Sequence, residues 1–193
     1  MDEAAIEARG AAPIEPFLAR IRAVQSYEDL MRLMGVIGFN SIVAPSVGPT
    51  PADPDSNAIW ISQAGLGMPH RGYYIGLDID SLATQVAYRT HIANILRLIG
   101  NSDPEGGAKR IYGLEFRIAQ AHTDEDRSLA ASDAMRTMSK EKLWAFAPSF
   151  DWDAFLETAK LDGSDRFVIM NQTAVADLAD LVVHSLVFAR VEV

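Results

Sequence analysis

The sequence predicts a mainly α-helical protein that folds as one domain over residues 1–193 and carries one small β-hairpin. Apolar residues recur at spacings of three and four through most of the chain, and Ser, Asp or Asn precedes several of these stretches. Two short β-type runs flank a single loop. A length of 193 residues with 49% hydrophobic content suits one domain with its own core, and the sequence contains no linker or internal repeat.

Two helices are predicted before residue 40. The first covers residues 13–24, where apolar side chains recur three and four positions apart. Ser26 precedes the second helix, and Asp29 follows three positions later, at the spacing of a capping box. Gly35 and Gly38 are expected to end this helix, because glycine readily adopts the backbone conformations found at helix ends.

The β-hairpin is predicted from residues 41–47 and 58–63, which are the two β-type runs. The loop 48–57 contains three prolines and three Asp or Asn residues, a composition typical of turns. A glycine-containing stretch, residues 65–74, leaves the second strand.

Two longer helices are predicted next. One begins after Asp78 or Asp80 and runs to about Ile99, where Gly100 ends it. The other has Pro104 at its first position, is capped by Ser102 or Asp103, and runs to about residue 121.

The remaining chain predicts three further helices and a short strand. Ser139 and Asp151 are each expected to cap a short helix, and residues 167–170 predict a small strand. Asn171 is expected to cap the last helix. Residues 124–137 are polar, and their pattern favours neither a helix nor a strand.

The side chains expected to face the core are the apolar residues at helical spacing. They are Ile14, Phe17, Leu18, Ile21, Leu30, Leu33, Met34, Leu82, Val86, Ile92, Ile95, Leu96, Ile99, Ile111, Leu114, Ile118, Ala121, Val175, Leu178, Leu181 and Val182.

The charge balance excludes polyanionic partners. Seventeen basic and 26 acidic residues give a formal net charge of -9, so nucleic acid and anionic membranes are repelled on average. No cysteine is present, which excludes disulfides and thiolate metal sites. The acidic N-terminus does not resemble a signal peptide, and no apolar run is long enough to cross a membrane. These features leave the localisation unknown.

The histidines are weak candidates for metal ligands. His91, His122 and His184 are isolated, and no second ligand lies at helical spacing on the same predicted helix. His122 has carboxylates nearby at Asp124 and Glu125, but an ordinary surface or half-buried imidazole is the favoured interpretation. The consecutive acids 124–126 favour a solvated turn over a cation site, because calcium ligands are spread along a longer loop. We therefore predict no metal ligand and no catalytic residue in this chain.

The glycines and aromatic residues favour structural roles. No G-K-[ST] follows Gly65 and Gly67, so they predict a left-handed backbone or close packing rather than a phosphate loop. Core packing is the favoured role of the two aromatic groups, with a peptide-contacting surface as the alternative. These groups consist of Tyr73, Tyr74, Trp144, Phe146, Phe150 and Trp152.

Residues 63–74, QAGLGMPHRGYY, resemble the G-L-G-L-P-x-R-x-Y-Y segment of the neprilysin and endothelin-converting-enzyme family of zinc metallopeptidases. Further segments are similar to that family in the same order along the chain. They are residues 1–10, Glu115 to Ala119, the stretch LWAFAPSFDW over 143–152, and residues 166–170. The resemblance extends to about Met170.

The residues that match the family segments are expected to be structural, and the binding residues stay unknown. The matching residues are Gly65, Gly67, Pro69, Arg71, Tyr73, Tyr74, Glu115, Pro148, Phe150, Asp151 and Trp152. Two departures stand out: His70 and Gly72 replace the two acids of the family's usual L-P-D-R-D-Y-Y, and residues 129–136 lack the polar residues usual at that place. A divergent or decayed family member would show such changes.

The resemblance implies the helical domain that covers the peptide chamber, while the zinc ligands of the family lie in a different domain. None of the four histidines begins an H-E-x-x-H sequence, the helix on which such a peptidase holds zinc. We therefore expect no zinc cofactor and no peptidase activity in this chain, although the intact family enzyme cleaves peptides with zinc. A stand-alone, non-enzymatic module that binds peptides or proteins is the alternative. Intact members are usually extracytoplasmic.

The expected partners are a catalytic peptidase domain, peptides, or a second copy of the chain. Residues 182–193 are apolar on nearly every side, which predicts association through Leu186, Val187 and Phe188. We also expect a helix-dominated circular dichroism spectrum and a cooperative melt, because caps and apolar stripes agree over most of the chain.

Overall fold

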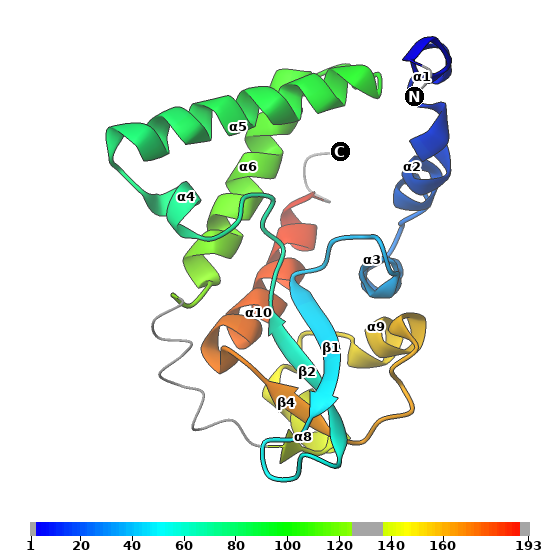
Figure 1. Ribbon diagram of the computed structural model, residues 1–193, viewed down its shortest axis with the longest axis vertical. Helices are drawn as coiled ribbons and strands as arrows, with labels where there is room; N and C mark the ends of the chain where they lie inside the picture. The colour runs from blue at the N-terminus through cyan, green and yellow to red at the C-terminus, as the bar shows by residue number, and fades with distance from the viewer. Residues whose placement is uncertain (1–2, 125–136, 190–193) are drawn as a thin grey trace.

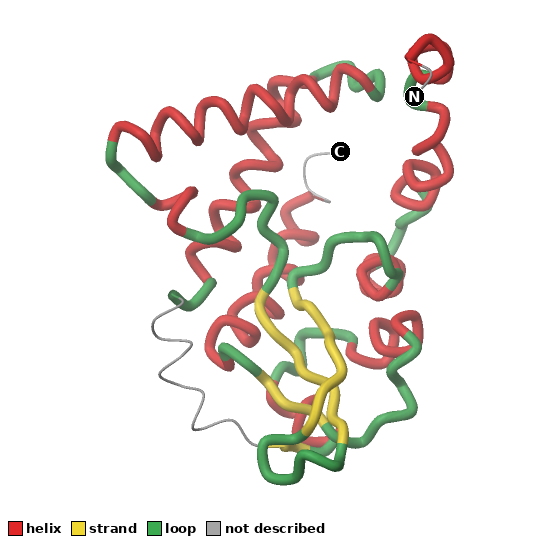
Figure 2. The backbone as a smooth tube through the Cα atoms, viewed as in Figure 1, coloured by secondary structure: helices red, strands yellow, loops and turns green. Residues whose placement is uncertain are grey.

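The computed structural model describes residues 3–124 and 137–189, apart from the side chains of residues 5, 6 and 184–189. Helices dominate it, and the few strands lie together in one half of the molecule (Figures 1 and 2). In chain order the elements are α1 (Glu3–Arg9), η1 (Ala12–Ile14), α2 (Glu15–Arg22), α3 (Tyr27–Gly35), β1 (Val43–Pro49), β2 (Asn57–Gln63), α4 (Gly72–Ile75), α5 (Ile79–Leu98), α6 (Pro104–Ala121), β3 (Thr137–Met138), α8 (Lys140–Phe146), α9 (Trp152–Ala159), β4 (Phe167–Ile169) and α10 (Gln172–Ala189). The predicted fold class is confirmed.

The sheet is larger than the predicted hairpin. The hairpin itself is present, because β1 and β2 pair antiparallel from Val43 opposite Gln63 to Pro49 opposite Asn57. However, β2 also pairs in parallel with β4, and β3 adds antiparallel to β4, so the strand order is β1-β2-β4-β3. The sequence predicted a strand at β4 but no partner for it, and β3 is too short to leave a pattern.

The main core lies where this sheet meets α3, α8, α9 and α10. Trp152, Phe155 and Phe167 are among its largest fully buried side chains. Helix α10 begins beside the sheet and extends toward α6 (Figure 1). The same helix therefore touches both the sheet and the α4–α6 group of helices.

The helices α4, α5 and α6 form their own smaller cores. Ala93 of α5 and Ala108 of α6 are buried together with Ile92, so the two helices approach through small residues. Gly107 belongs to this contact, since a Cβ atom there would lie 2.7 Å from Cδ1 of Leu96. Small residues at a crossing permit close packing of the helix backbones.

Several predicted apolar stripes are wrong in detail. Helix α5 exposes Leu82, Val86 and Ile95, and α6 exposes Ile111 and Leu114. The contact between these helices is filled instead by alanine and tyrosine side chains together with Ile92 and Leu96, which were predicted to face the core. Ile14, Phe17 and Ile21 beside and within α2 are also exposed, because no described element covers them. The core positions predicted in α3 and α10, such as Met34, Val175 and Leu178, are confirmed.

Most predicted caps are confirmed. Asp78, Asp103 and Asp151 accept hydrogen bonds from the backbone at the starts of α5, α6 and α9. Ser139 precedes α8 but makes no capping hydrogen bond through its side chain, so that prediction is wrong in detail. Asn171 precedes α10 with a φ of 54°.

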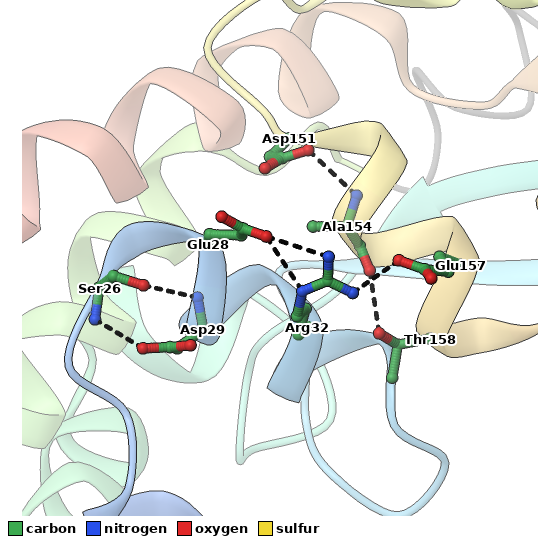
Figure 3. A network of polar contacts seen from close by, with 8 residues as sticks. All are labelled: Ser26, Glu28, Asp29, Arg32, Asp151, Ala154, Glu157 and Thr158. Atoms are coloured by element: carbon green, nitrogen blue, oxygen red, sulfur yellow. Dashed lines mark hydrogen bonds and ion pairs between the residues drawn. The ribbon is translucent and has the colours of Figure 1, made fainter.

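The start of α3 is held by the predicted capping box (Figure 3). The hydroxyl of Ser26 accepts a hydrogen bond from the Asp29 amide, and the Asp29 carboxylate accepts one from the Ser26 amide, both at 3.0 Å. Backbone hydrogen bonds from Gln25 and Ser26, and the Ser26 hydroxyl, lower the pKa of Asp29. One turn further on, Arg32 pairs with Glu28 and with Glu157 of α9, which joins the two helices.

We expect Ser26→Ala to lower the free energy of unfolding by about 1 kcal/mol, because the Asp29 amide loses its acceptor. Ser102→Ala is the matched control, since Ser102 is exposed and Asp103 caps the neighbouring helix. Urea unfolding followed by circular dichroism measures both. Equal effects of the two substitutions would contradict the capping role.

Candidate functional site

The segment 65–74, which resembles the family segment, spans the loop after β2 and most of α4, and it packs against α5 and α6. Its centre is the hydroxyl of Tyr74, a side chain that is 1% exposed. This hydroxyl accepts hydrogen bonds from the amides of Gly67 at 3.1 Å and Met68 at 2.8 Å. It donates to Oε2 of Glu115 on α6 at 2.7 Å. The structure therefore joins two sequence segments that are far apart, the glycine-containing loop and the Glu115 helix.

A second tyrosine completes this cluster. The Tyr88 hydroxyl on α5 donates to Oε1 of Glu115 at 3.2 Å. Burial raises the pKa of Tyr74 far above its ordinary value, and burial together with the Glu115 carboxylate raises the pKa of Tyr88 to about 12. Both hydroxyls therefore keep their protons at neutral pH and remain donors to Glu115.

Both predicted glycine roles are confirmed. Gly65 has a φ of +96°, a left-handed conformation that disfavours other residues. Gly67 faces the Tyr88 hydroxyl so closely that a Cβ atom would overlap it. The loop backbone can approach the Tyr74 cluster this closely because Gly67 has no side chain.

Arg71 fastens the loop to the end of α6. Its Nε donates to the carbonyl of Ala119 at 3.1 Å, and Nη1 forms an ion pair with Asp124 at 2.6 Å. The neighbouring His70 is exposed, and its ring packs against Tyr73 with centroids 4.5 Å apart. Its Nδ1 accepts a hydrogen bond from the Gly72 amide at 3.2 Å.

His122 and Gln63 form a polar joint beside Arg71. His122 is 8% exposed, and its Nε2 lies 2.9 Å from the carbonyl oxygen of Ala64, so Nε2 carries the proton and donates it. Gln63 and Thr123 exchange two hydrogen bonds, at 3.0 and 2.8 Å. His122 therefore acts as a hydrogen-bond donor to the backbone, and it is more buried than the surface or half-buried imidazole that the sequence favoured.

We expect His122 to make folding sensitive to acid. Burial lowers the pKa of His122 from 6.5; its hydrogen bond to Ala64 opposes this shift, and the Arg71 charge adds to it. The His122 imidazole therefore binds a proton more readily in the unfolded chain than in the folded one. The free energy of unfolding is thus at its full value above about pH 6.5, and it decreases as the pH drops through the lower pKa of the folded chain. Urea unfolding at pH 7.5 and 5.5 should show a smaller loss for His122→Gln than for the parent. His91→Gln, at an exposed histidine, is the control and should behave like the parent.

The family-like residues 148–152 lie apart from the Tyr74 cluster, and two of them, Phe150 and Trp152, belong to the main core. Trp152 packs against Phe150 with ring centroids 4.4 Å apart, and its indole nitrogen donates to the carbonyl of Ala147 at 3.1 Å. Asp151 caps α9, and Pro148 is exposed before it. These contacts favour core packing for this aromatic group.

An open groove of about 1060 Å³ runs beside the Tyr74 loop. One wall is β1 with the chain that leads into it, and another is the loop 63–72 with the end of α6. Phe155, Ala159 and Leu161 line it as well. The lining mixes apolar side chains with Arg71, His70 and Asp124, a surface that suits a peptide better than a small charged ligand.

The described part of the chain does not fit a zinc ion. It contains no group of three or more His, Asp or Glu residues placed to hold a metal. The side chain of His184, residues 125 and 126, and the divergent stretch 129–136 lie outside the described residues, as do the side chains of Leu186, Val187 and Phe188. Within the residues that the structure describes, no helix has the length and apolar character needed to span a membrane.

A family model described as peptidase family M13 matches residues 1–187. The chain belongs to peptidase family M13. The resemblance expected from the sequence is thereby confirmed, and so is the helical character of this part of the M13 fold.

Individual M13 proteins show the same relationship. Mouse endothelin-converting enzyme-like 1 is 29% identical over 135 residues, and human endothelin-converting enzyme 1 is 22% identical over 135 residues. These matches cover 67% and 66% of this chain, and the chain spans 17% of the length of either relative. The crystal structure of the Mycobacterium tuberculosis zinc metalloprotease ZMP1 with an inhibitor superposes with a TM-score of 0.84 at 25% identity, over 93% of this chain and 28% of that chain.

Sequence reasoning missed the supporting residues of the site. Tyr88 lies outside the recognised segments, and Gln63 begins one of them without matching a residue of the family pattern. Tyr88 nevertheless contacts Glu115, and Gln63 contacts Thr123. Gln85 was also missed, and its amide donates to the carbonyls of Tyr74 and Gly76. Gly67 was the available signal for Tyr88, because a glycine that permits close packing indicates a large neighbouring side chain.

Proposed function

We propose that this chain is the helical part of an M13 peptidase that walls the chamber in which peptides are cleaved, and that it catalyses no step itself. The match to peptidase family M13 over residues 1–187 supports this role. In an intact enzyme, a separate segment with the H-E-x-x-H helix would hold the zinc ion that activates water. The partner of this chain is then the catalytic domain, and its substrate class is peptides.

The observation that carries the proposal is that the polar side chains of the family segments bond to other groups of this same domain. The Tyr74 hydroxyl, both oxygens of Glu115 and two nitrogens of Arg71 all bond to groups inside this domain. A catalytic acid, base or nucleophile needs to reach a substrate atom, and these groups are already occupied. Their arrangement supports a role in shaping the wall rather than in chemistry.

A direct test measures cleavage of a quenched fluorescent peptide by the purified chain, and it measures the zinc bound to the chain after dialysis. We expect no chelator-sensitive cleavage and less than stoichiometric zinc. One tightly held zinc ion per chain, or cleavage that co-purifies with the chain and stops on chelation, would contradict the proposal.

A chimera tests the wall itself. Replacing the matching region of ZMP1 with this chain should preserve cleavage of a short peptide and continue to exclude a folded protein substrate. A chimera that folds but cleaves both substrates equally well would show that this domain does not limit access.

The groove favours one alternative, a stand-alone module that binds peptides or proteins. Val47 lines the groove and is 62% exposed, whereas Ile79 is 85% exposed and lies outside it. Saturable binding of an unstructured apolar peptide that is lost in Val47→Asp and kept in Ile79→Asp would support this alternative. Absence of binding to the isolated chain would leave the chamber-wall function as the better account.

A further inference from the structure

Strand β1 is the outermost strand of the sheet, so one of its edges has no strand beside it among the described residues. The hydrogen bonds show which residues face that edge. Ala64 donates to the carbonyl of Ile42, and Thr50 donates to the carbonyl of Ser56, at the two ends of the β1–β2 pairing. Antiparallel strands alternate between residues that bond to the partner and residues that turn away from it. The even-numbered residues 42–50 therefore bond toward β2, and Val43, Pro45, Val47 and Pro49 turn their backbone toward the outer edge.

Little of that outer edge is able to bond. Proline has no amide hydrogen, so Pro45 and Pro49 offer no donor. The Val43 amide donates to the hydroxyl of Ser41 at 3.3 Å, and the carbonyl of Pro49 accepts from the Trp60 indole at 3.0 Å. Val47 is the remaining outward donor of the strand, and its side chain is exposed.

We propose that Pro45 and Pro49 prevent antiparallel pairing of this sheet edge with β1 of a second copy of the chain. A symmetric pairing centred on Val47 would place Val47 opposite Val47, and Pro45 opposite Pro49 of the other copy. The Val47 pair could form its two hydrogen bonds, whereas both pairs of prolines would form none. An identical edge is present on every copy, and unguarded edges of this kind pair with each other.

The groove beside β1 leaves room for another strand at this edge, so the edge needs a feature that prevents pairing. Residues Val43 to Val47 line it, so its open space borders the unpaired edge. A sheet edge that adjoins open space and carries an exposed valine would otherwise be a template for another strand. The two prolines remove the donors there while leaving the bonds to β2 intact.

The test restores the missing donors with Pro45→Thr and Pro49→Thr in one variant. We expect its self-association to be at least about 100-fold tighter than that of the parent, because four amide donors become available in each pair of chains. Sedimentation equilibrium measures the association constants. The control is the Ala44→Thr, Ser46→Thr variant, which adds threonines to the same strand at positions whose amides face β2, and it should match the parent. Association through any other surface contributes equally to all three proteins.

The location of the contact is tested with Val47→Cys in each background, because the chain has no cysteine of its own. Disulfide-linked pairs should form faster in the Pro45→Thr, Pro49→Thr background than in the control. The single variant Pro49→Thr, at an exposed position, replaces the double variant if the latter does not melt cooperatively, and intermediate association is expected. Folded variants that associate no more than the control, or that associate without faster cross-linking at residue 47, would overturn the proposal.

Discussion

Gly35→Ala is expected to lower the free energy of unfolding by about 3 kcal/mol, at the upper end of what overpacking usually costs. Gly35 lies at the end of α3, where α3 packs against α9. An added Cβ atom would overlap the backbone carbonyl oxygen of Phe155 and would lie 3.1 Å from Cβ of Thr158. A backbone atom has no rotamer to change, so the two helices would have to separate. The Arg32 ion pair to Glu157 holds them together nearby.

Gly113→Ala is the matched control for this result. Gly113 lies within α6, and a Cβ atom there would meet nothing within 4 Å. Alanine favours a helix over glycine by about 1 kcal/mol, so this variant should be more stable than the parent. In guanidinium unfolding we therefore expect the free energy of unfolding to decrease for Gly35→Ala and to increase for Gly113→Ala. A Gly35→Ala variant as stable as the parent would show that the α3–α9 contact is looser than described.

Tyr74→Phe is expected to cost about 3 kcal/mol, although it removes a single oxygen atom. Without the hydroxyl, the amides of Gly67 and Met68 lose their acceptor and Glu115 loses its nearest donor. Each buried polar group left without a partner costs about 1–3 kcal/mol. The cost should appear as a lower denaturant midpoint with an unchanged slope, because the fold is retained.

Tyr73→Phe is the control for the Tyr74 substitution. The hydroxyl of Tyr73 has no hydrogen-bond partner within the described ranges, so the change should stay within about 0.5 kcal/mol. Similar losses at both tyrosines would contradict the view that the Tyr74–Glu115 bond holds the loop.

Features set by a few neighbouring residues were predictable from the sequence. The caps at Ser26, Asp78, Asp103 and Asp151 are examples, because a side chain and the amide that it accepts from are only three positions apart. The turn between β1 and β2 and the left-handed Gly65 follow from the same local rules. The family segments added the identity of Tyr74 and Glu115 but not their contact with each other.

Features set by distant residues were not predictable. The pairing of β2 with β4 joins Ile59 to Phe167, and nothing in either run specifies the other. The buried side of α5 was predicted only in part: Ile92 and Leu96 pack in the contact with α6, whereas Leu82, Val86 and Ile95 are exposed. The partner surface on α6 is made of Ala108 and Tyr112 rather than of large aliphatic residues. An apolar stripe shows that a helix has a face to bury, but the neighbour decides which face is buried.

The parallel contact between β2 and β4 has a consequence for the order of folding during synthesis. The β1–β2 hairpin is complete once Gln63 has left the ribosome, but Ile59 and Ile61 have no neighbour on their far side until Ile169 has emerged. For that interval the nascent chain exposes an apolar strand with unpaired amides, and such long-range pairings form slowly. Translation that stalls within this interval should yield a species that binds chaperones and aggregates, whereas release of the remaining residues should allow the sheet to close.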